Sequence, residues 1–334
     1  MKLLAALPLI AALAICQPGS AEPWENADPA QAGWSMSDLD AAKQHFETLG
    51  STAIMIVQDG KAIARWGDVG RKVNAASVRK SFLGALYGIA VSNGQIDLAS
   101  TLSDLGVDDV PPSLTPEEKR ATVRDLLMAR SGVYHRAAHE TAVIRRHRPE
   151  RGSHAPGTFF FYNNWDFNAL GTIYRKQTGD DIFQSFATRI AQPIGMEDFA
   201  LGDCRYVFEK VSEHPAYTFR MSARDLARFG QLILDRGQWA GQQLVPADWI
   251  TQSTITYSQS ERKGIGYGYL WWTLDPARWG DSASLASGFG GQLIAVLPAK
   301  RLVVVQTVDR SENKDGVRTS RFLRLLKDIV AAAP

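Results

Sequence analysis

Two β-rich segments near opposite ends of the chain set the strongest limit on its fold. Residues 51–67 read STAIMIVQDGKAIARWG, and residues 291–308 read GQLIAVLPAKRLVVVQTV. The first joins two apolar runs at Asp59-Gly60, the strongest short signal for a hairpin, and the second turns at Pro298. We therefore expect one antiparallel sheet that is assembled from both ends of the chain.

Helical periodicity occupies the residues between and after these β segments. The C-terminal residues 318–333 place apolar side chains on one stripe, formed by Phe322, Leu323, Leu325, Leu326, Ile329 and Val330. Four further helices are expected, within residues 74–94, 122–133 (with Thr122 as N-cap), 186–196 and 222–237. Residues 264–274, GIGYGYLWWTL, are expected to return to the sheet. The sequence thus predicts an α/β fold, with helices flanking the sheet and a mostly helical insertion at roughly residues 97–215.

The first 21 residues have the pattern of a secretory signal peptide. One basic residue, Lys2, precedes an apolar run that ends at Ile15, and small residues follow up to Ala21. This run is too short for a permanent membrane span. Cleavage after Ala21 is preferred to lipid attachment at Cys16, because bulky Ile15 stands where a small residue is needed. We expect an exported protein, periplasmic or secreted, with its mature domain at residues 22–334.

Charge and cysteine content narrow the function. The chain has 37 basic and 35 acidic residues and a formal charge of +2, so neither nucleic acid nor an anionic membrane surface is an expected partner. After cleavage only Cys204 remains, so no internal disulfide forms and the core alone must hold the fold. We expect a small-molecule substrate, and the oligomeric state is left open.

A serine and a lysine three residues apart, Ser77 and Lys80, begin an otherwise apolar segment at residues 74–94. On a helix this spacing brings the two side chains into contact. A lysine can take the serine proton only when its amine is neutral, and burial near a helix N-terminus lowers its pKa in that direction. An N-cap serine followed by a solvated basic turn is the alternative. Arg79 is expected to point elsewhere and stay solvated.

Tyr162 and Asn164 form a Tyr-x-Asn pair just before a helix-like run. A tyrosine hydroxyl near the lysine can relay a proton to a leaving group, and the asparagine amide can hold a substrate carbonyl. A core tyrosine beside a helix-capping asparagine is the alternative interpretation.

Three glycines, at positions 288, 290 and 291, interrupt the stretch ASGFGGQLIAV at residues 286–296. Glycine lets a substrate approach a strand edge, where an exposed backbone N–H can donate to a developing oxyanion. A plain turn or bulge between strands is the alternative.

Together and in this order, the three motifs resemble those of the serine β-lactamase and penicillin-binding protein superfamily. The similarity is to class C β-lactamases and related serine hydrolases, including 6-aminohexanoate dimer hydrolase and β-lactamase-fold carboxylesterases. It covers most of residues 50–330, because residues 122–133, 221–250 and 266–273 also look like connecting segments of that family. The resemblance implies an acyl-enzyme on Ser77, proton transfer by Lys80 and Tyr162, and no metal or organic cofactor. It also implies an oxyanion hole from the N–H groups of Ser77 and Phe289, with substrate contacts at Asn164, Ser287, Gly288 and Phe289.

One position departs from the family pattern. In β-lactamases and penicillin-binding proteins the third motif begins with a polar or cationic residue, usually Lys or His, that meets the substrate carboxylate, whereas this chain has Ala286. The loss of one charge-assisted hydrogen bond costs about 1.5–3 kcal/mol. The sequence therefore favours hydrolysis of an ester or amide. A cell-wall D-amino-acid peptidase, a weak β-lactamase and a non-catalytic binding protein of the same fold are the alternatives.

The remaining polar cluster lies in residues 134–154, which hold four histidines and several arginines. His135 and His139 are four residues apart, but no HExxH glutamate lies between them and no third ligand is evident, so no metal is expected. We expect a loop over the cleft, either solvated or with its arginines turned to an anionic substrate. Trp165, Trp271 and Trp272 are expected in the core or the cleft wall.

Overall fold

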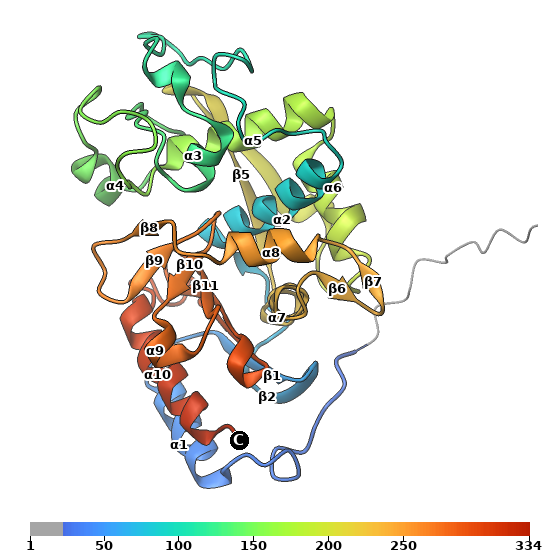
Figure 1. The fold of residues 1–334 in the computed structure, drawn as a ribbon. Coiled ribbons are helices and arrows are strands. Elements are labelled where there is room, and N and C mark those ends of the chain that lie inside the picture. Colours follow the sequence, from blue (N-terminus) through green and yellow to red (C-terminus); the bar gives the residue numbers. More distant parts are fainter. Residues whose placement is uncertain (1–22) are drawn as a thin grey trace, which may run out of the picture.

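The computed structural model describes residues 23–334, and its main feature is an eight-stranded antiparallel sheet (Figure 1). The strand order is β2-β1-β13-β12-β11-β10-β9-β8. The strands are β1 (Ala53–Gln58), β2 (Lys61–Gly67), β8 (Ser258–Gln259), β9 (Ile265–Tyr267), β10 (Trp272–Leu274), β11 (Ser284–Gly288), β12 (Gln292–Leu297) and β13 (Leu302–Thr307). Since β1 pairs directly with β13, the predicted sheet from both ends of the chain is confirmed.

Helices cover both faces of this sheet, as the burial of its central strands requires. Every residue of β12 and β13 is buried. Helix α7 (Ala223–Leu234) packs directly on these strands, and a Cβ at Gly230 would lie only 2.5 Å from Val303 Cγ1. Helices α1 (Met36–Glu47) and α10 (Thr319–Ala332) pack side by side at the opposite face (Figure 1). Four residues of the apolar stripe predicted for the C-terminal helix are buried, whereas Leu323 and Val330 are half-buried at its margins.

The residues between β3 (Val73–Asn74) and α7 form a mostly helical part, which lies above the sheet in Figure 1. Its helices are α2 (Arg79–Ser92), α3 (Val123–Leu127), α4 (Ala142–His147), α5 (Asn164–Thr178) and α6 (Ile182–Phe186). The N-cap at Thr122 is confirmed, because its hydroxyl accepts the Asp125 N–H in a capping box. The helix expected within residues 186–196 differs, since α6 passes into a π turn at Ala187–Ala191.

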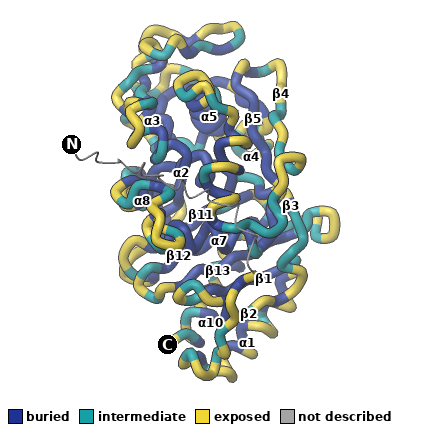
Figure 2. Tube along the Cα trace, turned by 90° about the vertical axis from the view of Figure 1, so that its right-hand side faces the viewer, coloured by how far each residue is buried: buried dark blue, intermediate teal, exposed yellow. Residues whose placement is uncertain are grey.

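A second sheet, which the sequence pattern did not predict, supports this helical part. It has three strands in the order β3-β5-β4, with β4 at Cys204–Glu209 and β5 at Ser212–Met221. Figure 2 shows β5, α5 and α2 as largely buried elements that lie beneath exposed loops. A small hairpin, β6 (Gln238–Trp239) and β7 (Gln242–Gln243), and the short helices α8 (Ala247–Ser253) and α9 (Pro276–Trp279) complete the fold.

The predicted signal peptide at residues 1–21, with Cys16, lies outside the described residues and stays a prediction. Within residues 23–334, none of the helices has both the length and the apolar character needed to cross a membrane.

Candidate active site

The serine of the first motif lies at the junction between the large sheet and helix α2. Ser77 is in a 3-10 turn, Ala76–Val78, that precedes α2, and Ala76 before it has a positive φ of 48°. The N-cap residues of this turn and of α2 are Ala75 and Val78, so the alternative of a capping serine at Ser77 is wrong. The turn exposes the Ser77 hydroxyl where β11 packs beside it.

Lys80 brings the first two motifs together. Its Nζ lies 2.9 Å from Ser77 Oγ and 2.7 Å from Tyr162 Oη. A third hydrogen bond of 3.0 Å runs from Nζ to Asn164 Oδ1. A neutral amine has two N–H donors and one lone pair. Nζ is placed as the donor to all three oxygens; once neutral, it can keep two of these bonds as a donor and accept the third from the Ser77 hydroxyl.

Burial shifts the pKa values of the lysine and the tyrosine in opposite directions. Lys80 is 1% exposed, and burial, followed by the nearby charge of Arg79, lowers its pKa well below the usual value. Burial raises the pKa of Tyr162 to about 12, although a Ser77 hydrogen bond and the charges of Arg79 and Arg262 oppose this rise. Burial thus favours the neutral amine of Lys80 and the protonated phenol of Tyr162.

Aromatic rings enclose the amine. Lys80 Nζ lies 4.4 Å from the ring centroids of both Tyr162 and Phe167, and the Trp272 ring stacks on Tyr162 at 5.1 Å. Aromatic faces favour a cation by about 0.5–2 kcal/mol. Taking an ammonium out of water costs several kcal/mol, so burial outweighs the rings.

Asn164, the first residue of α5, is engaged at both ends of its amide. Its Oδ1 accepts from Lys80, and its Nδ2 donates to the His139 carbonyl oxygen at 3.1 Å. One helical turn later Asn168 repeats the arrangement, because its Nδ2 donates to the Ala138 carbonyl at 3.0 Å. Asn164 therefore holds the lysine to the loop before α4, and its contact with a substrate carbonyl stays a prediction.

Arg79 is the clearest correction to the sequence analysis. We expected a solvated side chain, but Arg79 is 3% exposed. Its Nη2 donates to Asn168 Oδ1 at 3.4 Å, and its guanidinium lies 4.8 Å from the centre of the Tyr217 ring. The helix buries the arginine because α5 and β5 pack against the side of α2 that the hydrophobic pattern had left for solvent.

The third motif lies directly beside the serine turn. Gly288 ends β11, and a Cβ there would lie 2.6 Å from the Ala75 carbonyl oxygen and 3.1 Å from Ser77 N, so only glycine fits. The half-buried Ser287 precedes it and pairs with Leu293 across the sheet. Phe289 begins the turn to β12, and no acceptor within residues 23–334 takes its backbone N–H. The glycines thus form a turn between strands, and this turn lies beside the backbone N–H of Ser77.

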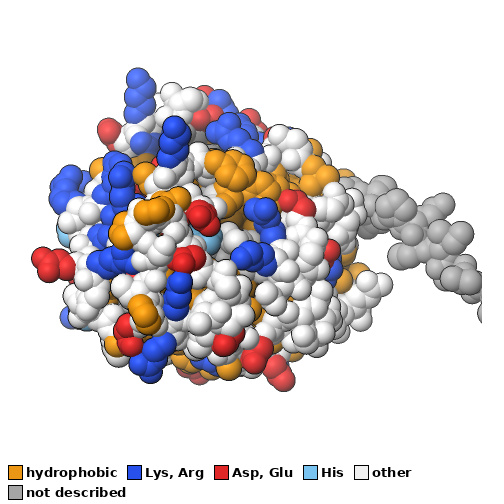
Figure 3. Space-filling view, turned by 90° about the horizontal axis from the view of Figure 1, so that it is seen from above, with side chains coloured by type: hydrophobic (Ala, Val, Ile, Leu, Met, Phe, Trp, Pro, Cys, Tyr) orange, Lys and Arg blue, Asp and Glu red, His pale blue; other side chains and the backbone are white. Residues whose placement is uncertain are grey.

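The basic side chains near the third motif belong to other segments of the chain. Ala286 is buried in β11, and the guanidinium of Arg310 lies 4.8 Å from the ring centre of the exposed Phe289. The arginines of the predicted cleft loop divide into two groups: Arg148 and Arg151 form ion pairs with Glu140 and Glu118, while Arg145 and Arg146 on α4 are exposed. Seen from above, Lys and Arg side chains gather on the side where α4 lies (Figure 3).

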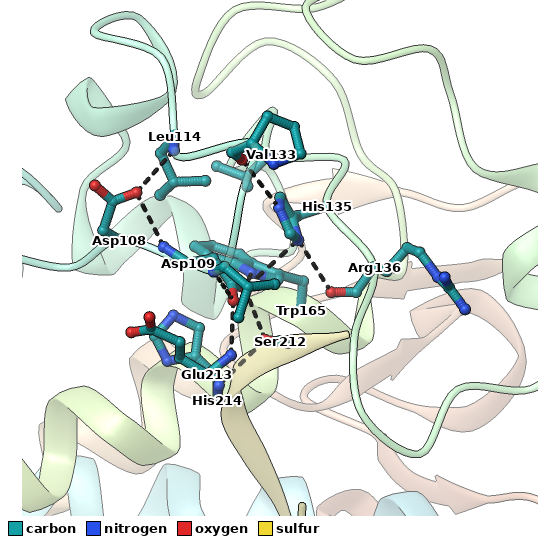
Figure 4. A network of polar contacts seen from close by, with 12 residues as sticks. Asp108, Asp109, Leu114, Val133, His135, Arg136, Trp165, Ser212, Glu213 and His214 are labelled. Carbon is teal, nitrogen blue, oxygen red and sulfur yellow. Dashed lines mark hydrogen bonds and ion pairs between the residues drawn. The ribbon is translucent and has the colours of Figure 1, made fainter. Parts of the chain in front are cut away.

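A buried polar cluster fixes the start of α5. The Asp109 carboxylate accepts the Trp165 indole N–H at 2.6 Å and the Ser212 hydroxyl at 2.7 Å (Figure 4). His135 Nδ1 lies 3.5 Å from the same carboxylate, and its Nε2 lies 3.3 Å from the Pro112 carbonyl oxygen. The cluster ties together a loop, the first turn of α5 and the start of β5, so it anchors the helix that carries the second motif.

Metal and thiol chemistry have no visible support among residues 23–334. No group of three or more His, Cys, Asp or Glu side chains there is arranged to hold a metal ion. Burial raises the pKa of the Cys204 thiol to about 12, so the thiol stays protonated near neutral pH.

Comparisons with known proteins place this geometry in a family. The Beta-lactamase family model matches residues 39–327. A D-aminopeptidase from Brucella anthropi is 26% identical over 199 residues, which cover 53% of this chain but only 37% of that relative. A beta-lactamase from Escherichia coli is 21% identical over 78% of this chain and 84% of its own length. The solved structure of a putative 6-aminohexanoate-dimer hydrolase from Bacillus anthracis is similar in fold. Its TM-score is 0.69 at 20% identity, covering 93% of this chain and 88% of that one.

Proposed function

This chain belongs to the Beta-lactamase family, and from that membership we propose that it is a serine hydrolase that cleaves an ester or amide through an acyl-enzyme on Ser77. One observation carries the proposal: a single buried amine, Lys80 Nζ, lies within hydrogen-bond distance of both Ser77 Oγ and Tyr162 Oη. A binding role does not require a buried amine in contact with two hydroxyls, whereas proton transfer does.

Each residue of the site has a part in the proposed reaction. The Lys80 lone pair takes the Ser77 proton as Oγ attacks the substrate carbonyl carbon. The resulting oxyanion is stabilised by the backbone N–H groups of Ser77 and Phe289. The proton then passes from Lys80 through the Tyr162 hydroxyl to the leaving oxygen or nitrogen as the bond to it breaks. Water attacks the acyl ester and gives a proton to the same pair, which returns a proton to Ser77 Oγ as the ester bond breaks and the acid leaves.

The proposed substrate class rests on Ala286, which stands in the third motif where the family pattern has a cationic or polar residue. Since Ala286 offers no charge, we propose an ester or amide without an obligatory carboxylate next to the scissile bond. A D-amino-acid peptidase or weak β-lactamase is the second candidate. It is favoured by the similar D-aminopeptidase and beta-lactamase and by the exposed arginines of α4.

Two alanine variants, one in the turn before α2 and one in its first turn, test the proposal. Ser77→Ala should abolish turnover of p-nitrophenyl butyrate and keep the thermal midpoint. Ser81→Ala, one position past Lys80 and bonded to the Leu270 carbonyl at 2.9 Å, should keep activity. If Ser77→Ala retains a tenth of wild-type kcat/KM, another residue is the nucleophile.

We also propose that the mature hydrolase comprises residues 22–334 and is exported after cleavage at Ala21. The amino-terminal sequence of the exported protein tests this: it should begin at Glu22. A product that begins at a lipidated Cys16 would contradict it.

A further inference from the structure

Two adjacent side chains at the start of α2, Arg79 and Lys80, are both cationic by type and both almost fully buried, at 3% and 1% exposure. Within residues 23–334 neither forms an ion pair. Lys80 bonds to two hydroxyls and an amide oxygen, and Arg79 bonds to an amide oxygen and faces a tyrosine ring. The Arg79 Nε is buried without a partner there.

The two cations are matched to a pair of asparagines one helical turn apart on α5. Asn164 Oδ1 accepts from Lys80 and Asn168 Oδ1 accepts from Arg79, while both Nδ2 atoms donate to the loop carbonyls of His139 and Ala138. Each of the two basic side chains thus has one amide oxygen as a hydrogen-bond acceptor. An amide is uncharged, so it does not neutralise a positive charge.

The nearest acid on α5 supplies no counter-charge. Asp166 is buried between the two asparagines in sequence, its Oδ1 accepts from Ser131 and Asn163, and burial raises its pKa well above the usual range. Burial therefore favours the neutral acid form of Asp166. Glu209 Oε1, on β4, is engaged by the His139 backbone N–H at 2.9 Å.

Two buried like charges without a counter-ion cannot both persist, and only one of these groups can give up its proton. A guanidinium does not deprotonate in proteins, whereas a buried lysine amine does so readily. We propose that Arg79 is a positioning residue whose fixed charge keeps the Lys80 amine unprotonated, so that it can act as the base for Ser77. This inference rests on the proposed roles of Ser77 and Lys80.

The direction of the pKa shifts supports the proposal. After burial, the charge of Arg79 is the second cause that lowers the pKa of Lys80, and it also lowers the pKa of Tyr162 against the effect of burial. The other titratable or charged groups that face this region, from the elements packed on it, are Tyr162, Tyr217, Tyr267, His139, Asp166, Glu209, Arg205 and Arg262.

The test is the pH profile of kcat/KM for p-nitrophenyl butyrate with Arg79→Gln and Asn168→Ala. Arg79→Gln removes the charge, so Lys80 should hold its proton to a higher pH. The acid limb should then move up by about one unit or more while the alkaline plateau changes little. Asn168→Ala loosens the same contact but keeps the charge, so its acid limb should stay within half a unit of the wild type. A purely structural role would lower both plateaus and move neither limb.

A limb that stays in place in Arg79→Gln, or moves equally in both variants, overturns the inference even if Ser77→Ala is inactive. Activity that survives in Ser77→Ala refutes the proposed function instead. Should Arg79→Gln fail to fold, Arg79→Met removes the same charge with a side chain of similar length. The ¹³Cε resonance of Lys80, assigned with Lys80→Met, should titrate at a higher pH in that variant than in the wild type, and equal titration overturns the inference.

Discussion

Replacing Asn164 by aspartate would test the protonation state of Lys80, because it would place a negative charge beside the amine. The new carboxylate would take the place of an amide oxygen that lies 3.0 Å from Lys80 Nζ. At that distance and an effective dielectric constant of about 20, the attraction between the two unit charges is about 5 kcal/mol. At 1.36 kcal/mol per unit, this corresponds to a ceiling of about 4 units in the pKa of Lys80.

The sign of the effect is definite. A neighbouring carboxylate favours the ammonium, so Lys80 would keep its proton near neutral pH and could not accept the proton of Ser77. The nearby Arg79 favours the ionised carboxylate in the same way. We expect the acid limb of kcat/KM for p-nitrophenyl butyrate to move up by two units or more in Asn164→Asp.

Asn164→Leu is the matched control, because it removes the same hydrogen bonds but adds no charge. Its plateau should fall while its acid limb stays near that of the wild type. If Asn164→Asp folds with an unchanged circular dichroism spectrum and its acid limb lies within half a unit of the wild type, Lys80 is not the base.

Three further predictions concern specificity, stability and cofactors. Because Ala286 offers no cation, kcat/KM for p-nitrophenyl butyrate should exceed that for nitrocefin, and Ala286→Lys should narrow the gap; a tenfold preference for nitrocefin, about 1.4 kcal/mol, would refute this. Burial raises the pKa of Asp225 from 3.8 to about 6. The protonated carboxyl therefore contributes fully to the free energy of unfolding below about pH 4, and this contribution, up to about 3 kcal/mol, is lost as the pH rises through about 6. Urea unfolding of Asp225→Asn should therefore depend less on pH between 4 and 7 than that of the wild type, and parallel curves would exclude this cause. EDTA and reducing agents should leave activity unchanged, as should Cys204→Ser; reversible inactivation by a chelator would point back to the histidine loop.

Local features of the sequence predicted the parts of the fold that depend on local chemistry. The turn at Asp59-Gly60 and the cap at Thr122 need only their neighbours, and both form as expected. The contact between Ser77 and Lys80 likewise follows from helical spacing alone. The approach of Tyr162 across the chain could be anticipated only through the resemblance to a family.

Features that depend on long-range packing were missed. Strand β4 lies at a sheet edge with half its residues exposed, and β5 contains Pro215, so neither shows a clean alternation. The burial of Arg79 depends on α5 and β5 packing over it, and no local pattern encodes that. Asn164 donates to the backbone carbonyl of His139, and a backbone acceptor cannot be recognised from residue types in the sequence.

The most direct test of the central claim is to locate the covalent intermediate. The wild-type protein is treated with a fluorophosphonate or quenched during turnover of a slow ester, then digested and mapped by mass spectrometry. One adduct should form, on the peptide that contains Ser77, and none should form in Ser77→Ala. An adduct on another residue, or full turnover of the ester with no adduct at any time, would contradict the account.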